Sequence, residues 1–126
     1  MSSDPVIAAV AAARSLVTAS PVVLVFANAA YADILVNWLS FARRAGAGAN
    51  VLVAALDAET ARIATTHAVA FFRMPPAASP ADMWIARAEL FSGLARAGVD
   101  FIHSDADAIW LRSPLPMSAA KSHGPT

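Results

Sequence analysis

Asp105 and Asp107, separated by Ala106, are the side chains of this chain best suited to chemistry. They follow the largely apolar run 99–103. Two carboxylates at positions i and i+2 after a buried strand can both reach one divalent cation, and Mg²⁺ and Mn²⁺ prefer oxygen ligands. Such a cation keeps positions open for substrate phosphate oxygens, so the triplet predicts a site for a metal-bound diphosphate. The alternative is a pair of solvated loop aspartates, one of which caps the next turn.

Two further polar residues stand where apolar runs end, and each suits a contact to a nucleotide. Asn28 comes after the run Val22–Phe26, and its amide can donate to and accept from the edge of a base. Asp57 follows Val51–Leu56, and its carboxylate suits a contact to the base or the ribose. The alternatives are that Asn28 is a turn residue and that Asp57 caps the next helix, a role compatible with nucleotide binding.

Arg87 is the candidate for a phosphate contact. It lies on a helix predicted to begin at Ser79-Pro80, where a serine cap and a proline in the first turn favour initiation. A guanidinium group on this helix can bind a diphosphate. Equally, Arg87 can be solvated or can pair with Glu89 or Asp82.

Continuous apolar runs alternate with segments of helical period along the chain. The pattern predicts strands over residues 22–26, 51–56, 68–72 and 99–103, and helices over 6–18, 31–44, 57–66 and from 79 to the glycine at 98. Side chains at helical spacing, including Ile34, Trp38, Trp84 and Phe91, are assigned to buried faces.

This alternation predicts an α/β fold with parallel, right-handed crossovers. In such sheets ligands gather beyond the carboxyl ends of the strands. We therefore expect Asn28, Asp57 and the two aspartates Asp105 and Asp107 at the same sheet edge.

Composition excludes several classes of protein. The 126 residues suit one domain, and nine basic and nine acidic side chains cancel, so no basic stripe indicates nucleic acid as a partner. The absence of cysteine excludes disulfides and thiolate metal sites. No apolar run approaches the roughly 20 residues of a membrane helix. We expect an N-terminal helix or leader over 1–20, a partial domain over 21–116 and a flexible tail over 117–126.

The sequence resembles the nucleotide-diphospho-sugar transferase domain, the group that includes plant and algal arabinosyl- and xylosyltransferases. The similar segments, in chain order, are Val23–Tyr31, Asn37–Leu39, Ala54–Asp57, Trp84–Leu90 and His103–Leu115. The last is the specific one, because the family typically has aspartate-x-aspartate, then tryptophan-leucine-arginine and a proline. Here Asp105-Ala106-Asp107 precedes Trp110-Leu111-Arg112 and Pro114.

The resemblance implies a Rossmann-like GT-A fold with a mostly parallel sheet and helices on both faces, here apparently truncated to the donor-binding half of a glycosyltransferase. It implies a nucleotide-sugar donor, a UDP-sugar, with Mn²⁺ or Mg²⁺ held by the Asp105-Ala106-Asp107 motif, and a glycan or glycoprotein hydroxyl as acceptor. It further implies nucleotide contacts at Asn28 and Asp57, a basic residue at Arg87, and a Golgi location if the chain is like the family.

Two other interpretations stay open. In a phosphatase of the haloacid-dehalogenase type an aspartate after a strand is the nucleophile, but that motif normally follows the first strand. The second alternative is an inactive, truncated transferase fragment that only binds nucleotide-sugar, because the acceptor half expected after residue 116 and the family's usual membrane anchor are missing from the sequence.

Overall fold

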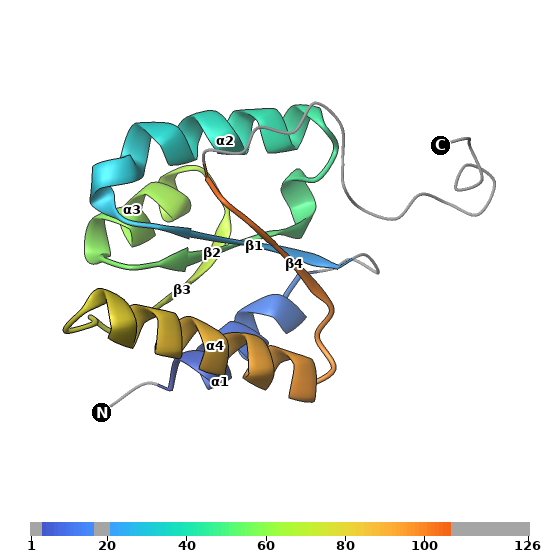
Figure 1. The fold of residues 1–126 in the computed structure, drawn as a ribbon. Coiled ribbons are helices and arrows are strands. Elements are labelled where there is room, and N and C mark those ends of the chain that lie inside the picture. Colours follow the sequence, from blue (N-terminus) through green and yellow to red (C-terminus); the bar gives the residue numbers. More distant parts are fainter. Residues whose placement is uncertain (1–3, 17–20, 107–126) are drawn as a thin grey trace, which may run out of the picture.

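The computed structural model describes residues 4–16 and 21–106, which form a parallel α/β domain (Figure 1). The helices and strands, in chain order, are α1 Pro5–Arg14, β1 Val22–Ala27, α2 Ala32–Arg44, β2 Val51–Ala55, α3 Ala58–Thr66, β3 Ala70–Arg73, α4 Pro80–Arg96 and β4 Phe101–Ser104, with short 3₁₀ turns η1 Ala29–Tyr31 and η2 Gly48–Asn50. The α/β fold class predicted from the sequence is confirmed.

The four strands form one sheet in the order β3-β2-β1-β4, and every neighbouring pair is parallel. The register places Val25 of β1 between Val53 of β2 and Ser104 of β4. The two central strands, β1 and β2, are buried along their whole length. Their continuous apolar sequences reflect this position, because a strand covered on both faces has no solvent side.

Helices cover both faces of the sheet, as expected (Figure 1). Val23 and Val25 of β1 pack with α2 and α3 on one face. Leu24 and Phe26, which point the other way, pack with α1 and α4. Alternate side chains of one strand therefore belong to two separate cores.

Local capping sets the helix ends. Asp57 and Ser79 accept a hydrogen bond from the backbone N–H three residues later, so the predicted caps of α3 and α4 are confirmed. Gly46 and Gly98, with φ of 88° and 78°, follow the ends of α2 and α4. Helix α1 ends at Arg14, before the predicted limit of the N-terminal helix, where the Ser15 hydroxyl donates to the Ala12 carbonyl at 2.6 Å.

Two predicted core positions are wrong. Trp84 is 67% exposed and Ile34 is 38% exposed. In α4 the buried positions are Leu90 and Leu94, which face the sheet, whereas Trp84 lies on a different side of the helix. Trp38, by contrast, is buried in α2 as predicted.

Helix α1 packs against β3 and α4, and its Ala9 and Ala13 are buried in the second core. No helix in the described ranges has the length and apolar character needed to cross a membrane.

Candidate functional site

The carboxyl edge of the sheet carries the predicted polar residues. Asn28 follows β1, Asp57 follows β2 and Asp105 follows β4, so the parallel topology brings all three to the same edge. Asp107, the second aspartate of the predicted metal motif, lies outside the described residues.

The strand order creates a switch point at this edge. The chain moves outward from β1 to β2 to β3, and then returns through α4 to place β4 on the other side of β1. In open parallel sheets, ligands bind in the crevice beyond the carboxyl ends of the two strands where the order reverses. In this protein those strands are β1 and β4.

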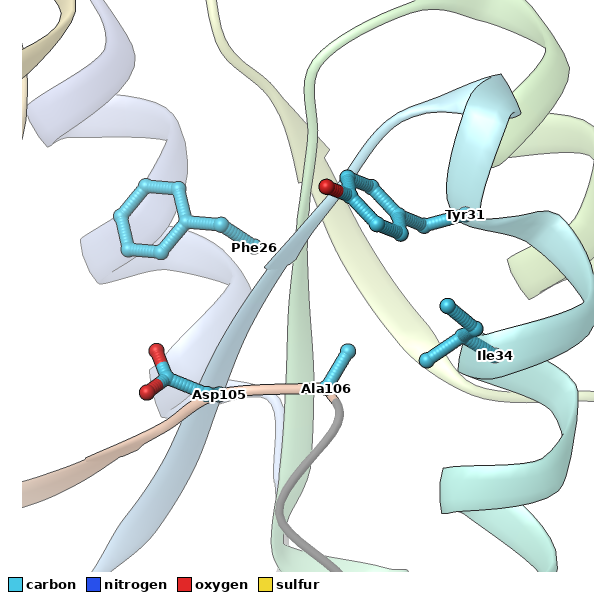
Figure 2. A pocket seen from close by; sticks show the side chains of 5 residues that line it. All are labelled: Phe26, Tyr31, Ile34, Asp105 and Ala106. Atoms are coloured by element: carbon cyan, nitrogen blue, oxygen red, sulfur yellow. The ribbon is translucent and has the colours of Figure 1, made fainter.

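A hollow of about 230 Å³ lies at this switch point. Figure 2 shows Tyr31 and Ile34 on one side of it, Phe26 on the other, and Asp105 and Ala106 along the segment that follows β4. The walls are therefore apolar and aromatic, and Asp105 contributes a carboxylate.

Asp105 is exposed, and no described side chain donates a hydrogen bond to its carboxylate. Its negative charge acts on two neighbours, because it opposes the lowering of the pKa of both Arg87 and His103. A carboxylate with open lone pairs beside a hollow is suited to binding a cation or a hydrogen-bond donor from a ligand.

Arg87 of α4 interacts electrostatically with this carboxylate. Its guanidinium carbon lies 4.2 Å from the centroid of the Phe26 ring and 5.3 Å from that of Trp84, within the range of cation–π attraction. Burial lowers the pKa of Arg87, and Asp105 opposes this effect. Its Nε is buried and has no hydrogen-bond partner among the described residues, so a donor next to the site is unused.

His103 lies on β4, an outer strand of the described sheet. Its ring packs 5.6 Å from Phe26 and 5.4 Å from Phe91, centroid to centroid. This partial burial lowers the pKa of His103; the charge of Asp105 opposes the effect and that of Arg87 adds to it. The neutral imidazole is therefore the favoured form near pH 7.

Asn28 and Asp57 differ in how far the protein satisfies them. The Oδ1 atom of Asn28 is buried and finds no hydrogen-bond partner among the described residues. Asp57 is already engaged: Oδ1 accepts from the Thr60 N–H at 2.9 Å and hydroxyl at 2.7 Å, and Oδ2 accepts from the Ala29 N–H at 2.8 Å. These bonds, with that of the Thr60 hydroxyl the largest, lower the pKa of Asp57.

Sequence reasoning missed the side chains that form the walls of the hollow. The sequence pattern predicts buried positions for Phe26 and Ile34 and only a helix start for Tyr31, whereas all three line the hollow. The available signal was the position of Tyr31, an aromatic residue four positions after the end of β1. The exposed fraction of its side chain, 53%, is consistent with a ligand-facing ring.

A divalent cation fits the part of this site that is described. Mg²⁺-type ions are commonly held by one or two carboxylates together with substrate phosphates. Asp105 offers an exposed carboxylate that accepts no hydrogen bond from the described side chains. The described residues contain no group of three or more potential metal ligands. Any such ion therefore depends on Asp105, on groups outside the described ranges and on the ligand itself.

Comparison with known proteins identifies one family. The model of the nucleotide-diphospho-sugar transferase family matches residues 47–123, which is more than half of the chain. The matched range includes Asp57, Arg87 and the Asp105-Ala106-Asp107 triplet, and it begins after Asn28 and Tyr31. No curated protein and no solved structure matches the chain.

Proposed function

The chain belongs to the nucleotide-diphospho-sugar transferase family, and we propose that the hollow between β1 and β4 is where it binds a nucleotide-diphosphate sugar, with a UDP-sugar as the donor. The observation that carries this proposal is the exposed carboxylate of Asp105, which accepts no hydrogen bond from a described side chain and lines a hollow with Phe26 and Tyr31 at the switch point of the sheet. This arrangement offers a nonpolar surface to a ring and a charged group to a metal-bound diphosphate.

Asp105, together with Asp107, would hold the cation. The family commonly depends on a divalent metal, and we propose Mn²⁺ or Mg²⁺ here. When bound, such an ion would offset the charge that develops on the departing diphosphate, as a Lewis acid. The sugar would pass to a hydroxyl of a glycan or glycoprotein acceptor.

The Nε of Arg87 and the Oδ1 of Asn28 have no hydrogen-bond partner among the described residues. The guanidinium of Arg87 remains protonated at physiological pH and is already positioned by Phe26 and Trp84, so we assign it to the diphosphate. The buried Oδ1 of Asn28 suits an N–H donor of the base. Both groups would gain a partner when a nucleotide binds, which compensates for their burial.

The alternative function, a phosphatase, requires a nucleophilic aspartate that this chain does not have after its first strand. A phosphatase of the haloacid-dehalogenase type normally carries its nucleophilic aspartate after the first strand, and Asn28 occupies that place here. The first aspartate of the Asp105-Ala106-Asp107 triplet follows β4 instead.

Calorimetric titration of UDP in the presence of Mn²⁺, and again with EDTA, tests the proposed function. We expect wild-type protein to bind UDP only with the metal, and Asp105→Asn to weaken binding at least about tenfold, or roughly 1.4 kcal/mol. Asp100→Asn is the matched control, because Asp100 is an exposed aspartate at the opposite end of β4. We expect it to bind as the wild type does.

Equal binding with and without EDTA would contradict the metal-dependent site. A protein that is folded by circular dichroism and releases no heat with UDP would contradict the proposed donor site itself.

A further inference from the structure

The carboxylate of Asp57 joins two loops at the carboxyl edge of the sheet. Through Oδ1 it caps α3 by accepting from Thr60, and through Oδ2 it accepts from the N–H of Ala29, 28 residues earlier in the chain. Ala29 is the first residue of η1, the turn that leads from β1 into α2. The side chain therefore connects the start of α3 to the start of η1.

The hydrogen bond between Asp57 and Ala29 lies just beyond the last backbone hydrogen bond between the ends of β1 and β2. The N–H of Leu56 donates to the carbonyl of Ala27 at 2.9 Å, and the Asp57–Ala29 bond is the next connection along the same two loops. Within η1, the Tyr31 N–H donates to the Asn28 carbonyl at 3.0 Å. The segment from Ala27 to Tyr31 is thus fixed at alternate residues.

Tyr31 needs such an anchor. Its side chain is 53% exposed, so packing restrains the ring less than it restrains a core residue. The conformation of η1 then largely decides where the ring lies relative to the hollow that it lines. A ligand that contacts a preorganised ring avoids the entropic cost of ordering it on binding.

We propose that Asp57 is a positioning residue: by holding the Ala29 N–H, it fixes η1 and thereby places Tyr31 at the wall of the ligand hollow. The effect on donor affinity rests on the proposed function, whereas the effect on Tyr31 does not. A carboxylate has about four lone-pair directions, and three hydrogen bonds already occupy this one. This internal role also explains an aspartate at this position without a direct contact to the nucleotide.

The chain contains a single tyrosine, so 3-fluorotyrosine labelling gives one ¹⁹F resonance, and that resonance reports on Tyr31. The test variant is Asp57→Ser, which keeps a good N-cap residue for α3 but is too short to reach Ala29 as well. Asp57→Asn is a second variant, because its single amide oxygen can serve Thr60 or Ala29 but not both.

Two controls separate positioning from general effects. Asp4→Ser makes the same change at the N-cap of α1, where the carboxylate accepts from Val6 and holds no second loop. Asp33→Asn removes a negative charge two residues from Tyr31 without touching the Ala29 bond. Circular dichroism and thermal unfolding establish that every variant is folded.

In nucleotide-free protein, we expect Asp57→Ser to broaden or split the Tyr31 resonance and to raise its solvent-isotope shift between H₂O and D₂O. Asp57→Asn should do so less, and both controls should resemble the wild type. UDP affinity with Mn²⁺ should then fall severalfold in Asp57→Ser.

An unchanged Tyr31 resonance in folded Asp57→Ser would overturn the proposal. A lower UDP affinity with an unchanged resonance would also overturn it, because it would indicate direct contact between Asp57 and the ligand. If the resonance changes as expected while the wild type binds no UDP, the positioning role stands and the proposed function fails.

Discussion

At the scale of single residues, two aspartates at one sheet edge have different roles because their surroundings differ. Asp57 faces N–H groups at the start of α3 and of η1, so its carboxylate is satisfied within the protein. Asp105 faces a hollow, and no described side chain donates a hydrogen bond to it. A satisfied carboxylate stabilises the fold, whereas an open one can bind a ligand.

The hydrogen bonds to Asp57 predict a specific dependence of stability on pH. They lower its pKa in the folded state below the usual value of 3.8, so near this pH the unfolded chain binds more protons. The free energy of unfolding therefore rises with pH through this range. The contribution of the Asp57 carboxylate to it is lost as the pH falls from about 4 through the folded-state pKa. We expect urea denaturation to show wild type more stable than Asp57→Asn at pH 6, with the difference shrinking towards pH 3.

Asp100→Asn serves as the control for this pH series, because the Asp100 carboxylate accepts no hydrogen bond from the described residues. Its stability curve should run parallel to that of the wild type. A difference between wild type and Asp57→Asn that stays constant from pH 6 to pH 3 would contradict the role assigned to the Asp57 carboxylate.

Single-residue features were predictable from the sequence where they depend only on near neighbours. The caps at Asp57 and Ser79 each involve a contact within three residues, and both were predicted. The exposure of Trp84 depends on how α4 lies across the sheet, which the helical spacing alone does not determine. The hydrogen bond from Ala29 to Asp57 was equally invisible, because it joins residues from different loops.

At the scale of elements, the three helices α2, α3 and α4 end in the same way. After each, the residue beyond the cap has a positive φ, and paired backbone bonds close the last turn. In α3 these bonds run from Val69 to Ala64 and from Ala68 to Thr65, which is a Schellman ending. Glycine occupies the left-handed position after α2 and α4, whereas Ala68, with φ of 56°, occupies it after α3.

We therefore predict that Ala68→Gly stabilises the protein. Alanine in the left-handed region costs about 1–2 kcal/mol, while glycine adds roughly 0.4–1 kcal/mol of entropy to the unfolded chain. The expected net gain is roughly 0.5–1 kcal/mol, seen as a melting temperature a few degrees higher. Ala61→Gly, in the interior of α3, is the matched control and should destabilise by about 1 kcal/mol. A lower melting temperature for Ala68→Gly would refute this account.

The same ending explains an error in the predicted strand boundaries. The sequence places the third strand at residues 68–72, but Ala68 and Val69 close α3, and β3 runs from Ala70 to Arg73. A run of small and apolar residues does not by itself distinguish a helix ending from a strand. The longer, continuously apolar strands β1 and β2 were predicted to within one residue at each end.

At the scale of the whole molecule, the order of the strands creates the site. Alternation of strands and helices predicted a parallel sheet and a common edge for the polar residues, and the structure has the parallel sheet and places Asn28, Asp57 and Asp105 at one edge. The sequence carried no direct signal that β4 pairs with β1 instead of β3. That pairing places Asp105 beside Phe26 and Tyr31, and so the hollow could not be predicted from local patterns.

Helix α1 covers part of the core of the domain, so its removal should affect the folding of the whole molecule. We expected residues 1–20 to be an N-terminal helix or leader, and a separable leader can be removed without loss of folding. However, α1 packs against β3 and α4, and its Ala9 and Ala13 are buried in a core shared with Leu90 and Leu94. We predict that deleting residues 1–20 abolishes cooperative unfolding, because uncovering several apolar side chains at about 1.5–3 kcal/mol each approaches the 5–15 kcal/mol of a whole domain.

Point variants at the contact between α1 and α4 test, without the deletion, whether α1 contributes to the stability of the domain. A Cβ added at Gly93 of α4 would overlap the side chain of Val6 in α1, so Gly93→Ala should cost about 1–3 kcal/mol by forcing the two helices apart. Val6→Ala removes the overlapping methyl groups and should recover much of that loss in the double variant. Ile7→Ser, at a position that is 68% exposed on the same helix, should change stability by less than about 0.5 kcal/mol. If the deleted protein unfolds cooperatively at the wild-type temperature, and Gly93→Ala has no effect, then α1 is a separable leader and not part of the domain.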